Sequence, residues 1–205
     1  MARRSGGYRH PWNRELDGPD PEEVFDGLLE RLLTPLTRVL EAGCSHGPDA
    51  VRFGPRSARW VGDDFTPELL DLARQNAPEA EFVLWDGKTV PPAEFNPPFD
   101  LIVSRRGPTS VIPHLPALAA LRARFLYVGP TWDVPQARER LEAIGWATLG
   151  EWRTRVRAWL PTWNDYALKC EFAGEELDES DWQAHATERG LAYSEERLTL
   201  LCAAA

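Results

Sequence analysis

The sequence has few cysteines and no long apolar run. Its three cysteines, Cys44, Cys170 and Cys202, are far apart, and no two have the spacing of metal ligands such as Cys-x-x-Cys. We therefore expect free thiols, no metal site and a reduced, cytoplasmic environment. No stretch approaches the roughly 20 apolar residues that cross a bilayer, and no apolar segment follows the N-terminal arginines. We expect neither a membrane span nor a secretory signal.

An excess of positive charge is also missing. The 23 Lys and Arg residues are outnumbered by 32 Asp and Glu residues, which gives a formal net charge of −9. Proteins that bind a nucleic-acid backbone usually carry a basic stripe. Here arginine is concentrated only locally, from Arg3 to Arg14 and at Arg153, Arg155 and Arg157. This balance argues against RNA or DNA as the substrate without excluding either.

The order of apolar patterns indicates strands that alternate with helices. The 205 residues, 43% of them apolar, are enough for one full-sized domain. We expect an N-terminal arm and helix over residues 1–35 and the main domain over 36–205, with a helical insert at about 161–191. Strands are expected at 37–41, 59–63, 80–85, 99–104, 125–128, 146–159 and 197–202, and helices at 21–33, 49–53, 67–75, 111–121 and 134–144. This predicts a Rossmann-like, doubly wound α/β sheet of seven strands, mostly parallel with an antiparallel last strand.

Three carboxylates follow the first three expected strands. Glu41 ends the first strand, Asp64 the second and Asp86 the third, about one strand–helix unit apart. The carboxyl ends of parallel strands share one edge of a sheet, and ligands bind there. Gly43 and Gly47 frame the turn after the first strand, where glycine lets a ligand approach the backbone. We expect a ligand site at this edge.

The charges at this edge distinguish two cofactors. A carboxylate after the second strand can accept both ribose hydroxyls, and one after the third can accept from an adenine amino group. Glu41 would repel the pyrophosphate of a dinucleotide, whereas S-adenosylmethionine has no phosphate and carries a sulfonium and an ammonium. Ser45 also removes the Gly-x-Gly-x-x-Gly pattern of a dinucleotide fold. These residues favour S-adenosylmethionine as the cofactor. They argue against a nicotinamide cofactor and therefore against an oxidoreductase.

The turn itself resembles a motif of a known family. The segment from Glu41 to Gly47 is similar to the acidic-x-Gly-x-Gly-x-Gly turn of the class I S-adenosylmethionine-dependent methyltransferases, in which Gly43 and Gly47 match the outer glycines. Ser45 stands in place of the middle glycine, where it either weakens cofactor binding or supplies a hydrogen bond. The resemblance covers roughly residues 36–130 and implies the methyltransferase fold and S-adenosylmethionine as the cofactor.

Two further segments extend the resemblance. The second strand ends in an acidic residue followed by a hydrophobic residue, Thr-Pro and a helix, as in the family. This implies that Asp64, not Asp63, holds the ribose and that Phe65 packs on the adenine. Asp86 and Gly87 are similar to the family's Asp-Gly segment, which implies that Asp86 meets the adenine amino group. The cofactor-binding residues expected in full are Glu41, Gly43, Cys44, Ser45, Gly47, Asp64, Phe65, Asp86, Gly87, Ser104 and Arg105.

The fourth strand ends in Ser104 and Arg105 at the same edge. Arg105 either binds an anionic substrate or the methionine carboxylate, or is an ordinary surface arginine or one paired with an acid at the sheet edge. Asn96-Pro97-Pro98-Phe99 resembles the signature of methyltransferases that modify adenine or amide nitrogens. In those enzymes the motif follows the fourth strand, whereas here it precedes it. We interpret it as a turn that leads into the strand.

No side chain stands out as a general base. The candidates are His10, His46, His114 and Asp165. His46 and His114 rank first, because one lies in the cofactor turn and the other follows the fourth strand, but lone histidines are more often structural or surface residues. The catalytic residue therefore stays open.

The most consistent function is a methyltransferase that acts on a small molecule. The chain is acidic, is expected to form one domain and has no appended RNA-binding module. An RNA or protein methyltransferase on the same fold, and a methyltransferase-like protein that binds cofactor without catalysis, are the alternatives. On the arm, Tyr8 and Trp12 either fold over the cofactor or fray. The acceptor, its accepting atom and the oligomeric state are left open.

Overall fold

The computed structural model describes residues 11–204, so the calls on Tyr8 and His10 lie outside the described residues. The chain divides into two compact units. The core unit consists of Val24–Arg153 and residues 197–204. The insert unit consists of residues 11–23 and Thr154–Glu196.

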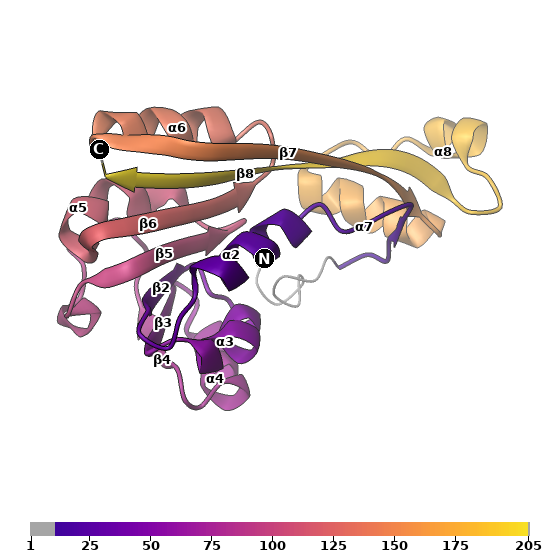
Figure 1. The fold of residues 1–205 in the computed structure, drawn as a ribbon. Coiled ribbons are helices and arrows are strands. Elements are labelled where there is room, and N and C mark those ends of the chain that lie inside the picture. Colours follow the sequence, from indigo (N-terminus) through magenta and orange to yellow (C-terminus); the bar gives the residue numbers. More distant parts are fainter. Residues whose placement is uncertain (1–10, 205) are drawn as a thin grey trace. The chain divides into compact units, whose positions relative to one another are not determined.

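The sheet has the predicted Rossmann-like order. Its strands follow one another as β1-β7-β8-β6-β5-β2-β3-β4. Strands β2 to β6 are parallel, β8 is antiparallel to β6, and Figure 1 shows β7 and β8 running in opposite directions. The predicted fold class is confirmed, with eight strands instead of seven. The strands are β1 (Glu15–Leu16), β2 (Arg38–Ala42), β3 (Arg59–Asp64), β4 (Glu81–Leu84), β5 (Phe99–Arg105), β6 (Ala119–Gly129), β7 (Trp146–Leu160) and β8 (Leu191–Ala204).

The additional strand comes from the segment that we expected to be an extended arm. Glu15 and Leu16 pair antiparallel with Trp159 and Ala158 of β7. Two residues carry too little pattern to be recognised as a strand, because only the pairing partner defines them. The arm therefore contributes backbone to the edge of the insert unit's part of the sheet.

Helices begin and end close to the predicted positions, with one exception. The segment 111–121 is not a continuous helix. It forms a 3-10 turn at Thr109–His114 and one helical turn at Leu115–Leu118 (α5), and β6 already begins at Ala119. Pro113 and Pro116 each remove a backbone donor, which limits helix length. The remaining helices are α2 (Glu23–Leu32), α3 (Pro48–Phe53), α4 (Pro67–Asn76), α6 (Val134–Ala143), α7 (Trp163–Ala173) and α8 (Glu179–His185).

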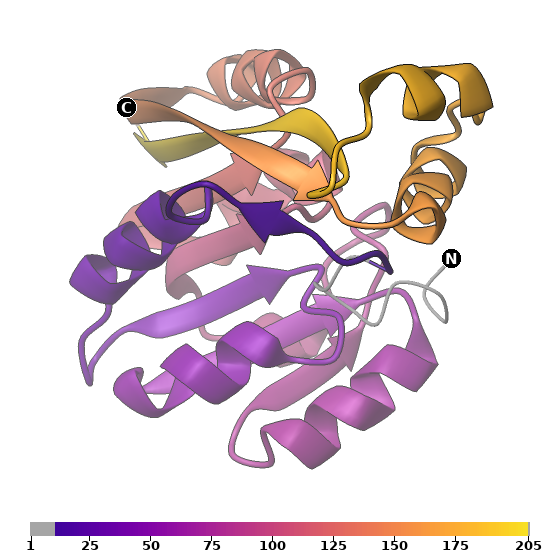
Figure 2. The ribbon, with the colours of Figure 1, turned by 90° about the vertical axis from the view of Figure 1, so that its right-hand side faces the viewer.

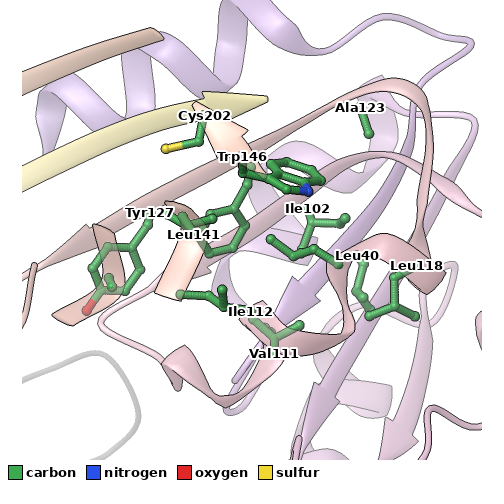
Figure 3. Close-up of a cluster of buried hydrophobic side chains, with 14 of the residues drawn as sticks. Leu40, Ile102, Val111, Ile112, Leu118, Ala123, Tyr127, Leu141, Trp146 and Cys202 are labelled. Carbon is green, nitrogen blue, oxygen red and sulfur yellow. The ribbon is translucent and has the colours of Figure 1, made fainter. Parts of the chain in front are cut away.

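The core unit buries both faces of its parallel strands. Successive strand residues point to opposite faces. Leu40 and Ile102 pack with the 3-10 turn, α5 and α6 on one face (Figure 3). Val39 and Leu101 pack with α2, α3 and α4 on the other. Figure 2 shows these three helices, in indigo to purple, gathered on one side of the strands. The helices cover the two faces of the sheet, and the loops that connect strands to helices lie at the ends of the strands.

The insert unit has its own small aromatic core. Trp12, Leu160, Tyr166, Cys170 and Leu191 are buried together. Helices α7 and α8 lie between β7 and β8 in the sequence. None of the helices in residues 11–204 is long and apolar enough to cross a membrane.

Candidate functional site

The three expected carboxylates follow neighbouring strands of the core unit. Strands β2, β3 and β4 are parallel and adjacent, with Ala42 opposite Asp63 and Asp64 opposite Leu84. The carboxyl ends of these strands therefore meet at one edge. Glu41, Asp64 and the loop containing Asp86 are brought there, as the spacing predicted. The Asn96–Pro98 turn precedes β5 and so lies at the opposite edge.

The turn after β2 uses left-handed backbone at alternate residues. The φ angles are 73° at Gly43, 54° at Ser45 and 77° at Gly47. At Gly43 a side chain would also collide, because a Cβ atom would lie 2.6 Å from Cδ of Pro108. Ser45 thus keeps the backbone conformation of a glycine, which is costly for an L-residue. The turn retains its three-glycine geometry despite the serine.

The amides of this turn are engaged within the protein. Ser45 N donates to Oδ2 of Asp64 at 3.0 Å, and Cys44 N donates to the Asp63 carbonyl at 2.7 Å. Gly47 N donates to the Cys44 carbonyl at 3.0 Å. Phosphate-binding turns point such amides at the ligand. This turn offers few of them to an anion, so its geometry disfavours a pyrophosphate.

Asp63 is a buried acid next to the turn. It is only 2% exposed, and its carboxyl accepts a hydrogen bond from the Gly43 amide. Its Oδ1 atom has no hydrogen-bond partner among residues 11–204. Burial, with a smaller contribution from Asp64, raises the pKa of Asp63 well above its usual range. Sequence reasoning passed over Asp63 in favour of Asp64. The alternation of strand side chains could have shown that the two point to opposite faces.

Asp64 braces the turn and the helix that follows it. Its Oδ1 accepts from Thr66 N at 2.8 Å while Oδ2 accepts from Ser45 N. A carboxylate has about four acceptor positions, so ribose hydroxyls could still bind. Phe65, at the start of α4, is 72% exposed. An apolar ring left in water beside a carboxylate suits a nucleoside.

The loop after β4 holds Asp86 in the open. Its side chain is exposed, and Oδ1 accepts from Lys88 N at 2.9 Å. Gly87 has a φ of 71° and packs too closely on Ser110 to carry a side chain. His114 Nε2 lies 3.1 Å from the Gly87 carbonyl and therefore donates to it. The structure places His114 as a support of this loop.

Glu41 and His46 differ in their surroundings. Glu41 is fully buried, and its Oε2 accepts from Trp60 Nε1 at 2.9 Å. His46 is half-buried, with Nδ1 3.4 Å from Ser45 Oγ, and its carbonyl accepts from the Asn76 side chain. Burial, with smaller contributions from Glu41 and Asp63, raises the pKa of the Cys44 thiol, so Cys44 stays neutral.

Arg105 lies in a buried ion-pair network. Its Nε is 2.8 Å from Oδ2 of Asp49, its Nη2 pairs with Asp26, and its guanidinium lies 4.4 Å from the centre of the Phe25 ring. The network ties β5 to α2 and α3. The expectation of a surface arginine is wrong, because Arg105 is buried; it is paired, with acids of α2 and α3, and these pairs offset its charge within the protein. Ser104 is fully buried, and its Oγ has no hydrogen-bond partner in the described part of the chain.

Two other residues singled out from the sequence belong to the insert unit. Asp165 accepts from Asn13 N at 2.7 Å and from Thr162 Oγ1 at 2.6 Å. Trp12 is buried and packs edge-on against Phe172 at 5.4 Å. Both oxygens of Asp165 therefore hold the arm and the start of α7. Between residues 11 and 204, no three His, Cys, Asp or Glu side chains are grouped so that they could hold a metal ion.

The chain is similar to a known family and to several solved structures. The family model described as "Methyltransferase domain" matches residues 39–128. A solved structure described as a functionally unknown protein from Deinococcus radiodurans R1 is 59% identical, over 98% of this chain and 95% of that one, with a TM-score of 0.93. The chain matches none of the proteins of curated function with which it was compared.

More distant structures share the fold. A putative methyltransferase from Bacillus halodurans C-125 is 14% identical, over 88% of this chain and 98% of that one, with a TM-score of 0.64. Magnesium protoporphyrin IX methyltransferase from Synechocystis PCC 6803, solved with bound S-adenosylmethionine, is 15% identical, over 90% and 79%, with a TM-score of 0.58. Residues 39–128 belong to the methyltransferase-domain family, and the sheet has the Rossmann-like order expected of the class I S-adenosylmethionine-dependent methyltransferases. S-adenosylmethionine is the methyl donor that this membership implies.

Proposed function

We propose that this protein transfers a methyl group from S-adenosylmethionine to a small-molecule acceptor. The turn after β2 carries the proposal. It keeps left-handed backbone at Gly43, Ser45 and Gly47, and its amides are engaged within the protein. The turn therefore suits close approach by a ligand without a phosphate. Asp64 at the end of β3 and Asp86 in the loop after β4 would supply acceptors for ribose and adenine.

The charge of the site supports a cationic ligand. When bound, S-adenosylmethionine supplies an electrophilic methyl group on a positively charged sulfur. Glu41 and Asp64 lie beside the turn. The nearby cation Arg105 is already paired with Asp49 and Asp26. Asp64 and the exposed Asp86 therefore favour a sulfonium and an ammonium over a pyrophosphate, whereas the buried Glu41 carboxylate accepts from Trp60.

The overall charge supports a small-molecule acceptor over a nucleic acid. With a net charge of −9, the chain is repelled by a nucleic-acid backbone unless a local basic surface compensates. RNA methylation, protein methylation and cofactor binding without turnover are the competing outcomes. The test is to supply radiolabelled S-adenosylmethionine and a cell extract. Transfer of the labelled methyl group into the small-molecule fraction would support the proposal. Label found only in RNA or protein would contradict the choice of acceptor, and cofactor binding without any labelling would indicate a non-catalytic protein.

Calorimetry tests the cofactor assignment with matched variants. Asp86→Ala removes an exposed carboxylate that accepts only from the Lys88 amide in the described structure. A lost charge-assisted hydrogen bond costs about 1.5–3 kcal/mol, so affinity for S-adenosylmethionine should fall about 10- to 100-fold. Glu79→Ala removes an equally exposed acid before β4, at the other end of that strand, and should leave affinity unchanged. Equal effects of the two variants, or tighter binding of NADH, would overturn the assignment.

A further inference from the structure

The loop after β6 reaches the same sheet edge as the cofactor turn. In the core unit, Ser104 and Arg105 of β5 pair with Tyr127 and Val128 of β6. The order β6-β5-β2 then puts the end of β6 two strands from the turn. The residues implied in nucleoside binding follow β2, β3 and β4. The ends of β5 and β6 are therefore the part of this edge left for a second ligand.

This loop exposes a large aromatic side chain. Trp132 is 76% exposed, whereas Trp146, at the start of β7, is buried in the core. Leaving an indole in water forgoes the favourable free energy of burying its apolar surface. A stacking surface for a planar ligand would explain its position. Leu121, near the amino end of β6, is also exposed but lies at the opposite edge of the sheet.

Beside the indole is a carboxylate with an unusual arrangement. Asp133 is the N-cap of α6, but its side chain makes no capping hydrogen bond. Aspartate at this position ordinarily accepts from a first-turn amide. Here Oδ2 accepts from the Tyr127 hydroxyl at 2.5 Å, and no other hydrogen bond to the Asp133 carboxylate occurs among residues 11–204.

Tyr127 holds that carboxylate in place from the buried side of β6. Its side chain is fully buried, and Figure 3 shows it at the margin of the apolar cluster formed with Ile112 and Leu141. Burial, and then the neighbouring Asp133, raise the pKa of Tyr127, so it remains a hydrogen-bond donor. One oxygen of Asp133 is thus held in place, which leaves the other for a ligand.

We propose that Trp132 and Asp133 bind the methyl acceptor, a planar aromatic compound that carries a hydroxyl or amino group. This inference rests on the proposed function. Trp132 stacks on the acceptor ring, Asp133 is the general base, and Tyr127 is a positioning residue. The acceptor oxygen or nitrogen forms a bond to the methyl carbon while the carbon–sulfur bond breaks. The electron pair of that bond stays on sulfur, and the acceptor proton passes to Asp133.

Binding of simple phenols tests the stacking surface. The protein is first saturated with S-adenosylhomocysteine and then titrated with 4-nitrophenol and 2-naphthol, followed by ligand-observed NMR. Trp132→Ala should weaken binding of both phenols about tenfold. Leu121→Ala, which truncates an exposed apolar side chain near the amino end of β6, should leave binding unchanged. No binding of either phenol, or equal losses in the two variants, would overturn the proposal.

The ionisation of bound 4-nitrophenol tests the base. A carboxylate next to the phenol favours its protonated form, so its apparent pKa should be higher when bound than when free. Asp133→Asn should abolish that rise, as read from the phenolate absorbance, and Tyr127→Phe should reduce it while changing affinity less than twofold. An unchanged spectrum in Asp133→Asn would contradict the role of Asp133.

Different results would contradict the proposed function and the proposed acceptor site. If S-adenosylhomocysteine does not bind the wild-type protein, the proposed function is wrong. If it binds normally to the wild type and to Trp132→Ala, but the phenols do not distinguish the variants, only the acceptor site is wrong.

Discussion

Replacing Ser45 by glycine should stabilise the protein. Ser45 has a φ of 54°, and left-handed backbone costs an L-residue roughly 1–2 kcal/mol. Glycine loses more backbone entropy on folding, which takes back roughly 0.5–1 kcal/mol. The Ser45 hydroxyl lies 3.4 Å from His46 Nδ1, too far for a strong hydrogen bond. The net gain is therefore about 0.5–1 kcal/mol, or about 1–4 °C in Tm for a chain of this size.

Two matched variants make this effect measurable by urea denaturation. Arg122 has a φ of 66°, so Arg122→Gly should also stabilise. Ser57 has a φ of −110° and donates to the Gly54 carbonyl at 2.8 Å, so Ser57→Gly should destabilise by roughly 1–2 kcal/mol. A loss of stability in Ser45→Gly comparable to that in Ser57→Gly would refute the strain argument.

The same variant decides the role of the Ser45 hydroxyl. The amide that donates to Asp64 is kept in glycine, so the turn stays braced. Affinity for S-adenosylmethionine should then change less than threefold by calorimetry. A tenfold loss would show that the hydroxyl itself binds the cofactor.

Three further substitutions test separate contacts. Asp63→Asn should remove one contribution to the pH dependence of stability. In the wild type Asp63 lowers stability as pH rises above about 4, by up to ~1.4 kcal/mol per pH unit, since the folded protein favours the neutral acid while the unfolded chain ionises. Arg105→Ala breaks the buried ion pair with Asp49 by removing one partner and should cost about 3–5 kcal/mol by urea denaturation. Asp165→Ala should accelerate amide hydrogen exchange at Asn13 at least about tenfold, because that amide loses its acceptor.

Each of these has a clear contrary result. Parallel pH profiles of the wild type and Asp63→Asn would mean that Asp63 is ionised when buried. A loss below about 1 kcal/mol in Arg105→Ala would show that the network is not a buried ion pair in solution. Unchanged exchange at Asn13 would show that Asp165 does not hold the arm.

The sheet was predictable because its signals are local. Each parallel strand is a short apolar run, and the Gly43 turn and the Thr66–Pro67 helix start are each recognisable from a few consecutive residues. Strand order then follows from the family resemblance and from the crossover rule. This is enough to bring Glu41, Asp64 and Asp86 to one edge.

The contacts that decide each side chain's role were not predictable in the same way. Arg105 pairs with Asp26 and Asp49, which are far from it in sequence, and no pattern in the chain announces those pairs. Glu41 looks like an open acidic wall in the sequence, but its partner is Trp60. Such roles depend on which groups are buried together, and burial is a property of the whole fold.

Hydrogen exchange with and without S-adenosylhomocysteine tests the central claim, that the turn after β2 holds the cofactor, most directly. We predict slower exchange in peptides covering residues 43–47, 64–66 and 86–88 when S-adenosylhomocysteine is added, and no change with NADH. Protection confined to other segments, or no protection at all, would contradict this account.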